Sequence, residues 1–399
     1  MNTVVIGPKD CGKTQLLKNL VFCLLQAKTR QKKVGFTILE TSRDFFSMIQ
    51  RMAAYFRIDL MVLHPQTVGK QESAKYNILA GKNAAVVAEV LGDALSQTYL
   101  GSESPEDREE LVTYFRLAIR VMKHSFGDEL SFQGLTNYIR EMNAIRPYVE
   151  TYAAQSELLA FTTPMERDFL ERIRQVPTDE SLATLIEKLS AYLDDIANNP
   201  EFAPFFQTNE VDVDLQEHVW DGGVLYIKTV PDTKIGKFFG LSISRLLQET
   251  IQRRHVYDRV PHYVFIDGIE PYVDSHMEVF LKEAGNHNCS CIFTLSTLQK
   301  AMYASLVKHC QNKIGFKGMS EKDSKRVVEL SGGQWTYDEW EQLNRILPPY
   351  WYAHSITVNG QEKQNLGITR VKPIDPYNPK SCMDRRGSDT YNLILSAVM

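Results

Sequence analysis

Eight residues near the start of the chain have the types and spacing of a loop that cradles phosphate. They are Gly7, Pro8, Lys9, Asp10, Cys11, Gly12, Lys13 and Thr14, which match the pattern G-x-x-x-x-G-K-[ST]. In such a loop the glycines let backbone amides curl around a phosphate, and Lys13 would reach the β- and γ-phosphate oxygens. The Thr14 hydroxyl would bind Mg²⁺ at the amino end of a helix. The pattern therefore predicts that the chain binds a nucleoside triphosphate together with Mg²⁺.

An acidic residue completes this chemistry when it lies at the end of a neighbouring buried strand, where it holds Mg²⁺ through water. The apolar run over residues 262–266 ends in Asp267. We therefore expect Asp267 to serve the same Mg²⁺ ion as Thr14, although the two residues are far apart in the sequence.

The elements that position these residues alternate between strand and helix. Residues 3–6 form a β-branched run directly before the loop, and apolar residues at helical spacing follow it. Further strands are expected over residues 34–39, 59–63, 223–227, 262–266, 290–295 and 313–316, and helices over residues 43–56 and 238–253. This alternation predicts an α/β fold with a largely parallel sheet and right-handed crossovers.

A long central segment lacks strand signals. From about residue 93 to residue 206, apolar side chains recur at helical spacing, which predicts an all-α insertion. We therefore expect a nucleotide-binding domain in two parts, residues 1–92 and 211–372, split by an all-α inserted domain over residues 93–210. Prolines and weak periodicity predict an extended tail over residues 373–399.

The composition is that of a globular chain without a general affinity for nucleic acid. The 399 residues are 43% hydrophobic, and 45 basic against 49 acidic side chains leave a net charge of −4. Contact with DNA would therefore be local, and the candidate is a basic stretch that contains Lys300, Lys308, Lys313, Lys317, Lys322, Lys325 and Arg326. Six scattered cysteines suit a reducing cytoplasm, and we expect Cys289 and Cys291 to pack in the core. Apolar stretches fall short of the ~20 residues that span a bilayer, so we expect a soluble, cytoplasmic chain.

The order of these elements resembles that of conjugative coupling proteins of the TraD/TraG type, which belong to the HerA-FtsK group of hexameric DNA pumps. The resemblance rests on the strand over residues 223–227, the helix over residues 238–253, the strand that ends at Asp267 and the run over residues 291–298. It covers most of residues 3–335 and implies a RecA-like P-loop ATPase core. It further implies ATP and Mg²⁺ as cofactors, a hexameric ring, and recruitment or pumping of DNA or protein for a type IV secretion-like system.

Two positions depart from that family's pattern. The residue after the metal-binding aspartate is usually a glutamate that polarises the attacking water, and here it is Gly268. The sensor strand usually ends in a glutamine, and the aligned residue here is Leu295. Two other acids could replace the missing carboxylate. Glu270 would need a bent strand end, and Glu40 ends a strand that we expect next to the phosphate-loop strand.

These departures leave two functions open. With Glu40 or Glu270 as the acid the chain would be an ATPase motor, and without one it would be a nucleotide-gated structural subunit that binds ATP with little hydrolysis. A small-molecule kinase with a helical lid is disfavoured because the insertion is far larger than a lid. A neighbouring subunit of a ring would offer an arginine, for which the candidates are Arg253, Arg254 and Arg326. Coupling proteins usually carry an N-terminal membrane anchor. The chain is therefore expected at the inner face of the cell membrane, through an anchor or partners, or as a stand-alone cytoplasmic relative.

Overall fold

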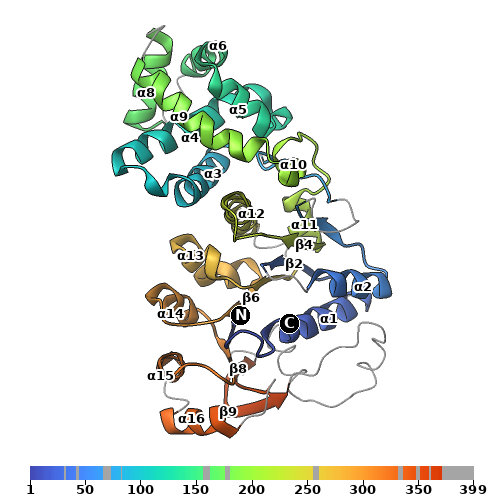
Figure 1. The fold of residues 1–399 in the computed structure, drawn as a ribbon. Coiled ribbons are helices and arrows are strands. Elements are labelled where there is room, and N and C mark those ends of the chain that lie inside the picture. Colours follow the sequence, from blue (N-terminus) through green and yellow to red (C-terminus); the bar gives the residue numbers. More distant parts are fainter. Residues whose placement is uncertain are drawn as a thin grey trace. The chain divides into compact units, whose positions relative to one another are not determined.

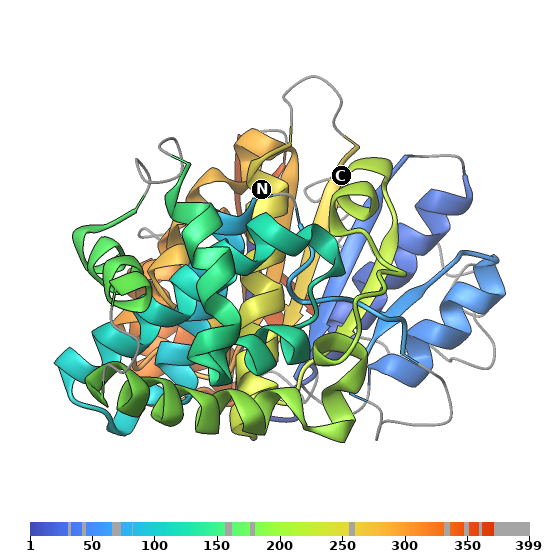
Figure 2. The same ribbon diagram turned by 90° about the horizontal axis from the view of Figure 1, so that it is seen from above.

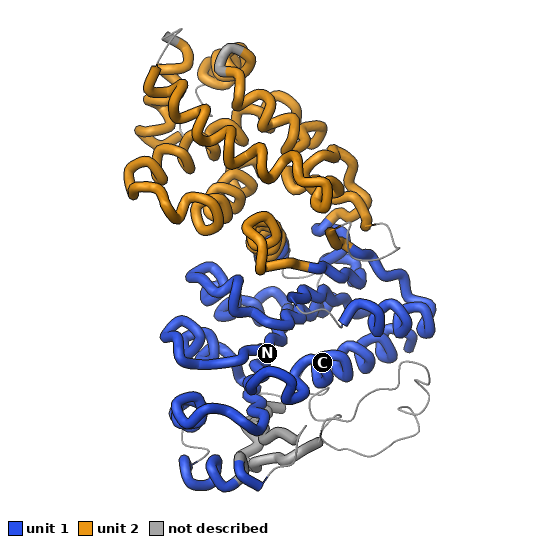
Figure 3. Tube along the Cα trace, in the orientation of Figure 1, with its two compact units in different colours: residues 1–62, 215–228, 247–399 blue, residues 63–214, 229–246 orange. Residues whose placement is uncertain are grey.

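The computed structural model describes residues 1–30, 33–41, 45–65, 73–81, 83–155, 162–175, 180–254, 260–330, 336–346, 351–358 and 361–370, the last two ranges by their backbone alone. The chain divides into two compact units, which are described separately (Figure 3). The first unit comprises residues 1–62, 215–228 and 247–399, and the second comprises residues 63–214 and 229–246. The tail expected over residues 373–399 lies outside the described residues.

A nine-stranded sheet forms the centre of the first unit. Its strands are β1 (Thr3–Ile6), β2 (Gly35–Glu40), β3 (Met61–Leu63), β4 (Val224–Lys228), β5 (His262–Asp267), β6 (Cys289–Leu295), β7 (Asn312–Phe316), β8 (Trp351–Val358) and β9 (Gln361–Arg370). They lie in the order β3-β4-β2-β5-β6-β1-β7-β8-β9. The pairs from β4 to β7 in that order are parallel, which confirms the expected α/β class with a largely parallel sheet.

The strand order corrects one expectation about the site. Glu40 was expected at the end of the strand next to the phosphate-loop strand, β1. In the sheet, however, β6 and β5 lie between β1 and β2. At about 4.8 Å per strand, Glu40 is three strand spacings from the loop. Asp267, whose strand neighbours β6, is two spacings away.

Helices cover both faces of the sheet in the first unit. Figures 1 and 2 show α1 (Lys13–Thr29) and α2 (Phe46–Phe56) on one face, and α13 (Ser275–Glu283), α14 (Ala301–Lys308) and α15 (Glu321–Leu330) on the other. The crossovers that contain α1 and α13 run in opposite directions along the sheet, so right-handed connections place them on opposite faces. The apolar residues of α1 at helical spacing, Leu16, Leu17, Leu20, Val21 and Leu24, are buried against the sheet as predicted. Helices α11 (Leu215–Asp221) and α16 (Tyr337–Ile346) complete the unit.

The second unit is helical. It contains α3 (Ala84–Thr98), α4 (Pro105–Phe126), α5 (Phe132–Arg140), α6 (Met142–Ala153), α8 (Pro164–Gln175), α9 (Glu180–Ala197), α10 (Ala203–Phe206) and most of α12 (Lys234–Gln252). The inserted domain expected over residues 93–210 falls inside this unit, which also takes in residues 63–92, 211–214 and 229–246. Aromatic packing explains why most of α12 belongs to the second unit. Phe239 on α12 stacks on Phe205 on α10, with ring centroids 4.3 Å apart.

Two further expectations concern the described residues as a whole. Cys289 and Cys291 are buried on β6, and burial raises the pKa of both thiols, as suits packing side chains. Within the described ranges, the helices are all too short or too polar to cross a bilayer.

Candidate nucleotide-binding site

The phosphate loop joins β1 to α1 at the carboxyl edge of the sheet. The Gly7 N–H donates to the Leu295 carbonyl at 3.1 Å, so the loop leaves the sheet directly after β1. A Cβ on Gly7 would lie 2.7 Å from Cys11 Sγ and from Phe316 Cβ, closer than real Cβ atoms come. Gly12 has a φ of 114° at the N-cap of α1, a conformation that favours glycine. The backbone of the loop therefore requires both glycines, as a phosphate cradle would.

The side chains between these glycines differ in exposure. Lys9 and Asp10 are exposed and Pro8 is half-buried. Asp10 turns the chain with a φ of 62°. Cys11 is half-buried, and burial raises the pKa of its thiol, so the sulfur is uncharged near neutral pH. Lys9 and Asp10 carry opposite charges and Cys11 is uncharged, so these three side chains together add no net charge to the loop.

Lys13 reaches back over the loop from the first turn of α1. Its ammonium donates to the Gly7 carbonyl at 2.5 Å and to the Pro8 carbonyl at 2.7 Å. An ammonium carries three protons, so these two bonds orient the group and leave it able to donate to a phosphate oxygen. The side chain is largely buried, which strengthens its interaction with an anion.

Thr14 and Asp267 meet where β5 ends. The Thr14 hydroxyl donates to Asp267 Oδ2 at 2.8 Å, across a separation of 253 residues in the sequence. Asp267 is buried, and the register of β2 with β5 sets it beside Glu40. A hydroxyl and a carboxylate are hard oxygen ligands, the donors that Mg²⁺ prefers. The residues present therefore fit a Mg²⁺ ion.

Gly268 occupies the position where the family pattern has a glutamate. Its φ is +85°, and a Cβ built there would overlap the Thr41 hydroxyl. The Gly268 N–H donates to Thr294 Oγ1 at 2.7 Å, so the chain turns sharply at this point. This backbone is compatible with glycine and strained for any other residue. The missing carboxylate therefore accompanies a different backbone course after β5.

Glu270 begins a short 3₁₀ turn, residues Glu270–Tyr272, which brings its carboxylate close to Gly268. Its Oε2 lies 3.7 Å from the point that a Cβ of residue 268 would occupy. Its Oε1 accepts a hydrogen bond from the Ser296 N–H at 2.5 Å, just beyond the end of β6. The bent strand end that the sequence required for this acid is present.

Glu40 is enclosed instead. The residue is 0% exposed, and its Oε1 accepts a hydrogen bond from the Phe45 N–H at 2.9 Å. Its Oε2 accepts from the Tyr226 hydroxyl, and the Lys228 ammonium lies 3.9 Å from Oε1. Burial, and then the charge of Glu40, raise the pKa of Tyr226, which keeps that hydroxyl a donor. These contacts tie β2 to β4 and to the start of α2.

Leu295 is buried at the end of β6 and presents no polar side chain to the site. The polar groups of this strand end belong to its neighbours, Thr294 and Ser296. Thr294 donates to Asp267 Oδ1 at 3.0 Å. Neither residue was predicted to lie in the site, because only Leu295 aligns with a sensor glutamine. The signal that could have found them was the pair of hydroxyl residues on either side of Leu295, at the end of an apolar strand.

The three arginines proposed for a neighbouring site have partners within their own chain. Arg254 is buried and donates to the carbonyls of Val260 and His287. Arg253 lies 3.8 Å from Glu249, and Arg326 lies 2.7 Å from Glu329. Arg254 thus has a structural role at the edge of the sheet where β5 begins.

The basic residues of the stretch over residues 300–326 differ in their partners and in their exposure. Lys325 pairs with Glu321 at 2.6 Å, and Lys313 and Lys317 are half-buried near β7. Lys308 and Lys322 are exposed at one end of α14 and of α15. These two lysines can reach a phosphate backbone more readily than the half-buried pair.

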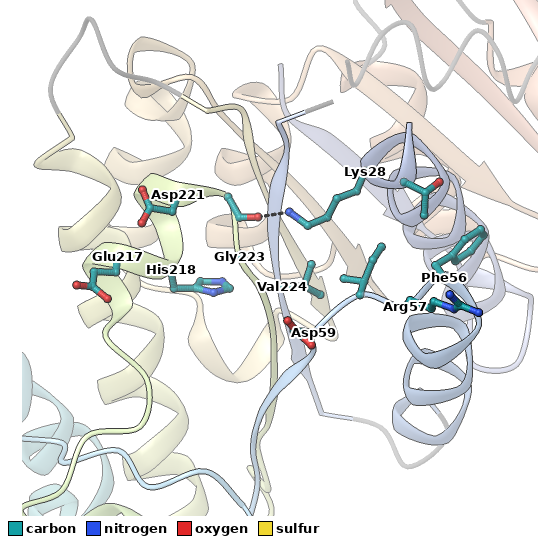
Figure 4. Close-up of a pocket in the computed structure, with 12 residues that line it drawn as sticks. Lys28, Phe56, Arg57, Asp59, Glu217, His218, Asp221, Gly223 and Val224 are labelled. Carbon is teal, nitrogen blue, oxygen red and sulfur yellow. Dashed lines mark hydrogen bonds between the residues drawn. The ribbon is translucent and has the colours of Figure 1, made fainter. Parts of the chain in front are cut away.

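A separate cavity of about 660 Å³ lies at the opposite, amino edge of the sheet (Figure 4). It is lined by the end of α1, the end of α2, α11 and the start of β4. The Lys28 ammonium donates to the carbonyls of Val34 at 3.0 Å and Gly222 at 2.5 Å, and burial lowers its pKa. Since the phosphate loop follows the end of a parallel strand, this cavity is not part of the nucleotide site.

Comparison with known proteins identifies the fold. Among sequences, no family model and no curated protein matches the chain. Among solved structures, it is similar to the bacterial conjugative coupling protein TrwBdeltaN70 in its unbound monoclinic form, with a TM-score of 0.62 and 15% identity over 94% of this chain and 85% of that one. TrwB in complex with ADP and Mg²⁺ gives a TM-score of 0.62 at 14% identity, over 94% and 86% of the two chains. VirB4 of Thermoanaerobacter pseudethanolicus gives 0.58 at 11% identity, over 94% and 90%. The expected α/β fold is thereby confirmed, and the likeness to these structures extends over 94% of the chain.

Proposed function

We propose that this chain is an ATP-binding motor or coupling subunit of a type IV secretion-like transfer system, in which it recruits or pumps DNA or protein. The observation that carries the proposal is the meeting of the phosphate loop, Thr14 and Asp267 at one edge of the sheet. The shared fold supports the setting, because TrwB is a conjugative coupling protein. Structures of TrwB contain ADP with Mg²⁺ or a non-hydrolysable ATP analogue, which supports these cofactors here.

The residues of the loop have distinct roles in this proposal. The loop amides and Lys13 would bind the β- and γ-phosphates, with Lys13 donating its remaining proton to a phosphate oxygen. Thr14 and Asp267 would hold Mg²⁺ with their hydroxyl and carboxylate oxygens. When bound, Mg²⁺ neutralises charge that develops on the phosphate oxygens. The helix dipole of α1 adds a further favourable field for the anion.

Glu270 is the acid that best fits the water-activating role. Its carboxylate lies beside Gly268, where the family's glutamate would start, and it is half-buried rather than enclosed. Glu40 has no exposed surface and already faces Tyr226 and Lys228, so a water molecule would have to displace those contacts to reach it. A general base must come within hydrogen-bond reach of the water it activates. Geometry therefore favours Glu270 over Glu40.

The nucleotide-gated structural subunit stays as the second candidate because of two specific observations. Residue 268 has a backbone that only glycine adopts without strain, and Leu295 offers no polar side chain where the family pattern has a sensor glutamine. If Glu270 stays bound to the Ser296 amide when nucleotide is present, hydrolysis would be slower by a factor of about 10² to 10⁴. The chain would then use ATP to stabilise an assembly.

Steady-state ATP turnover, measured with and without DNA, distinguishes these functions. We expect measurable turnover by the parent, a loss of about 10²-fold or more in Glu270→Gln, and near-parent turnover per folded molecule in Glu40→Gln. The two variants are matched, because each changes one carboxylate to the isosteric amide. ATP binding without turnover by the parent would favour the structural subunit. Turnover that survives Glu270→Gln but not Glu40→Gln would reverse the assignment.

Assembly and location follow as parts of the same proposal. We expect a homo-oligomeric ring, hexameric in form, that works with type IV secretion or conjugation components at the inner face of the cell membrane. In such a ring DNA would contact a local basic surface, and the exposed Lys308 and Lys322 are suited to this role. Native mass spectrometry with and without ATP tests the ring, and a chain that stays monomeric at all concentrations would contradict it.

A further inference from the structure

The end of β5 is held by a threonine on each side. On one side, Thr294 of β6 is buried, and its Oγ1 lies 2.7 Å from the Gly268 nitrogen and 3.0 Å from Asp267 Oδ1. On the other side, Thr41 follows β2, and its hydroxyl and its N–H both donate to the Asp267 carbonyl, at 2.7 Å and 3.2 Å. One threonine therefore contacts the Asp267 carboxylate, and the other contacts only its backbone.

The direction of the Thr294 hydrogen bonds follows from the chemistry of their partners. The Gly268 N–H can only donate, so Thr294 Oγ1 accepts from it. A hydroxyl has a single proton, and an ionised carboxylate can only accept, so that proton goes to Asp267 Oδ1. The hydroxyl orientation is thus determined from both ends. Such a charge-assisted bond in a buried site is stronger than a neutral one.

We propose that Thr294 is a positioning residue for Mg²⁺, which it serves by fixing the rotation of the Asp267 carboxylate. With Oδ1 held by Thr294, Oδ2 faces the Thr14 hydroxyl at 2.8 Å. The terminal torsion of an aspartate has a broad, roughly two-fold preference, so without this bond the carboxylate would sample other rotations. The inference rests on the proposed nucleotide site and adds to it a residue that does not touch nucleotide or metal.

The expected size of the effect follows from the general behaviour of such partners. Groups that orient a metal ligand through a hydrogen bond typically contribute about 10- to 100-fold to metal affinity. Thr294→Val keeps the shape and removes the hydroxyl, and Thr294→Ser keeps the hydroxyl. Thr41→Val is the matched control, because it removes a threonine hydroxyl from the same turn without touching the carboxylate.

The experiment titrates Mg²⁺ against the protein bound to a fluorescent, non-hydrolysable ATP analogue, and measures affinity for the same analogue in EDTA. We expect Thr294→Val to weaken the apparent Mg²⁺ affinity by about 10- to 100-fold, with metal-free affinity unchanged within about two-fold. Thr294→Ser and Thr41→Val should stay within about three-fold of the parent in Mg²⁺ affinity. Thermal melts establish that each variant is folded.

The outcomes separate this inference from the function on which it rests. A parent that binds no nucleotide would overturn the proposed site as a whole. A parent with normal Mg²⁺ dependence and a Thr294→Val variant that matches it would overturn only the role of Thr294. Equal losses with and without Mg²⁺, or the same loss in Thr41→Val, would show a merely structural role and overturn it too. If Thr294→Val does not fold, Thr294→Cys replaces it, because a thiol is a weak donor. Thr294→Cys should then bind Mg²⁺ at least about 10-fold more weakly than Thr294→Ser.

Discussion

Acid should destabilise the α/β unit through two buried histidines at the amino edge of its sheet. His262, at the start of β5, is 0% exposed, and His218, on α11, is 8% exposed. Their Nε2 atoms lie 3.0 Å and 3.2 Å from the same Thr37 hydroxyl. Burial lowers the pKa of His218 to about 4, and burial together with the charge of His218 lowers the pKa of His262 well below its usual value. Both rings are therefore neutral in the folded protein near neutral pH.

The sign and size of the effect follow from proton linkage. Below pH 6.5 the unfolded chain binds protons on these histidines that the folded chain does not, so stability falls as the pH drops from about 6.5 to about 4. pH 5 lies 1.5 units below the ordinary histidine pKa of about 6.5. At about 1.4 kcal/mol per unit, the loss of stability that His218 causes at pH 5 is therefore about 2 kcal/mol. Burial also lowers the pKa of His262, so its contribution has the same sign and the pair loses more stability than His218 alone. This is a large part of the stability of an ordinary domain.

Urea unfolding followed by tryptophan fluorescence at pH 7.5 and pH 5 measures this loss, because Trp220 and Trp340 belong to the unit that contains the sheet. His218→Gln and His262→Gln cannot titrate and keep a polar group for Thr37. His218→Gln should reduce the pH-dependent loss by about 2 kcal/mol, and His262→Gln should reduce it as well. His276→Gln, at an exposed position on α13, is the matched control and should leave the loss unchanged. If the parent and both buried variants lose equal stability on acidification, the reasoning is refuted.

Three further predictions concern the nucleotide site and the basic stretch. Lys13→Ala should weaken ATP affinity by about 30-fold or more with the fold intact, because its buried ammonium is oriented towards the phosphate site; equal affinities by calorimetry would remove the nucleotide proposal. Gly268→Ala should lower stability by about 1–3 kcal/mol, since its Cβ would meet Thr41 in a strained backbone; an unchanged melting temperature would contradict the geometry of this turn. Lys308→Glu combined with Lys322→Glu should flatten the salt dependence of DNA binding by about one to two units, while Lys325→Glu, whose lysine already pairs with Glu321, should change it less. A slope that is the same in all variants would leave these lysines as ordinary surface residues.

Local patterns in the sequence were sufficient for the parts of the site that lie within one element or one turn. The phosphate loop, the strand before it and the helix after it depend on residues a few positions apart, and the structure has all three. The burial of Leu16 and Leu20 on α1 follows from helical periodicity in the same way. Asp267 was found because a strand that ends in an acid is also a local signal.

Contacts between distant segments decided the remainder. The order of strands in the sheet set β6 and β5 between Glu40 and the phosphate loop, and the antiparallel pair β8 and β9 was not anticipated at all. A strand carries no information in its own residues about which neighbour it will have, because pairing depends on how separate helices pack on the two faces.

The acidic residues illustrate the same division. The sequence by itself determined that a carboxylate was missing at position 268 and that Glu40 and Glu270 were the candidates to replace it. Only the tertiary structure enclosed Glu40 between Tyr226 and Lys228, from another part of the chain, and turned Glu270 back towards Gly268. It also brought Thr294 onto Asp267, across 27 residues of sequence. Residue types and spacing set which chemistry is possible, whereas distances of 3 Å between side chains arise from packing that no single segment specifies.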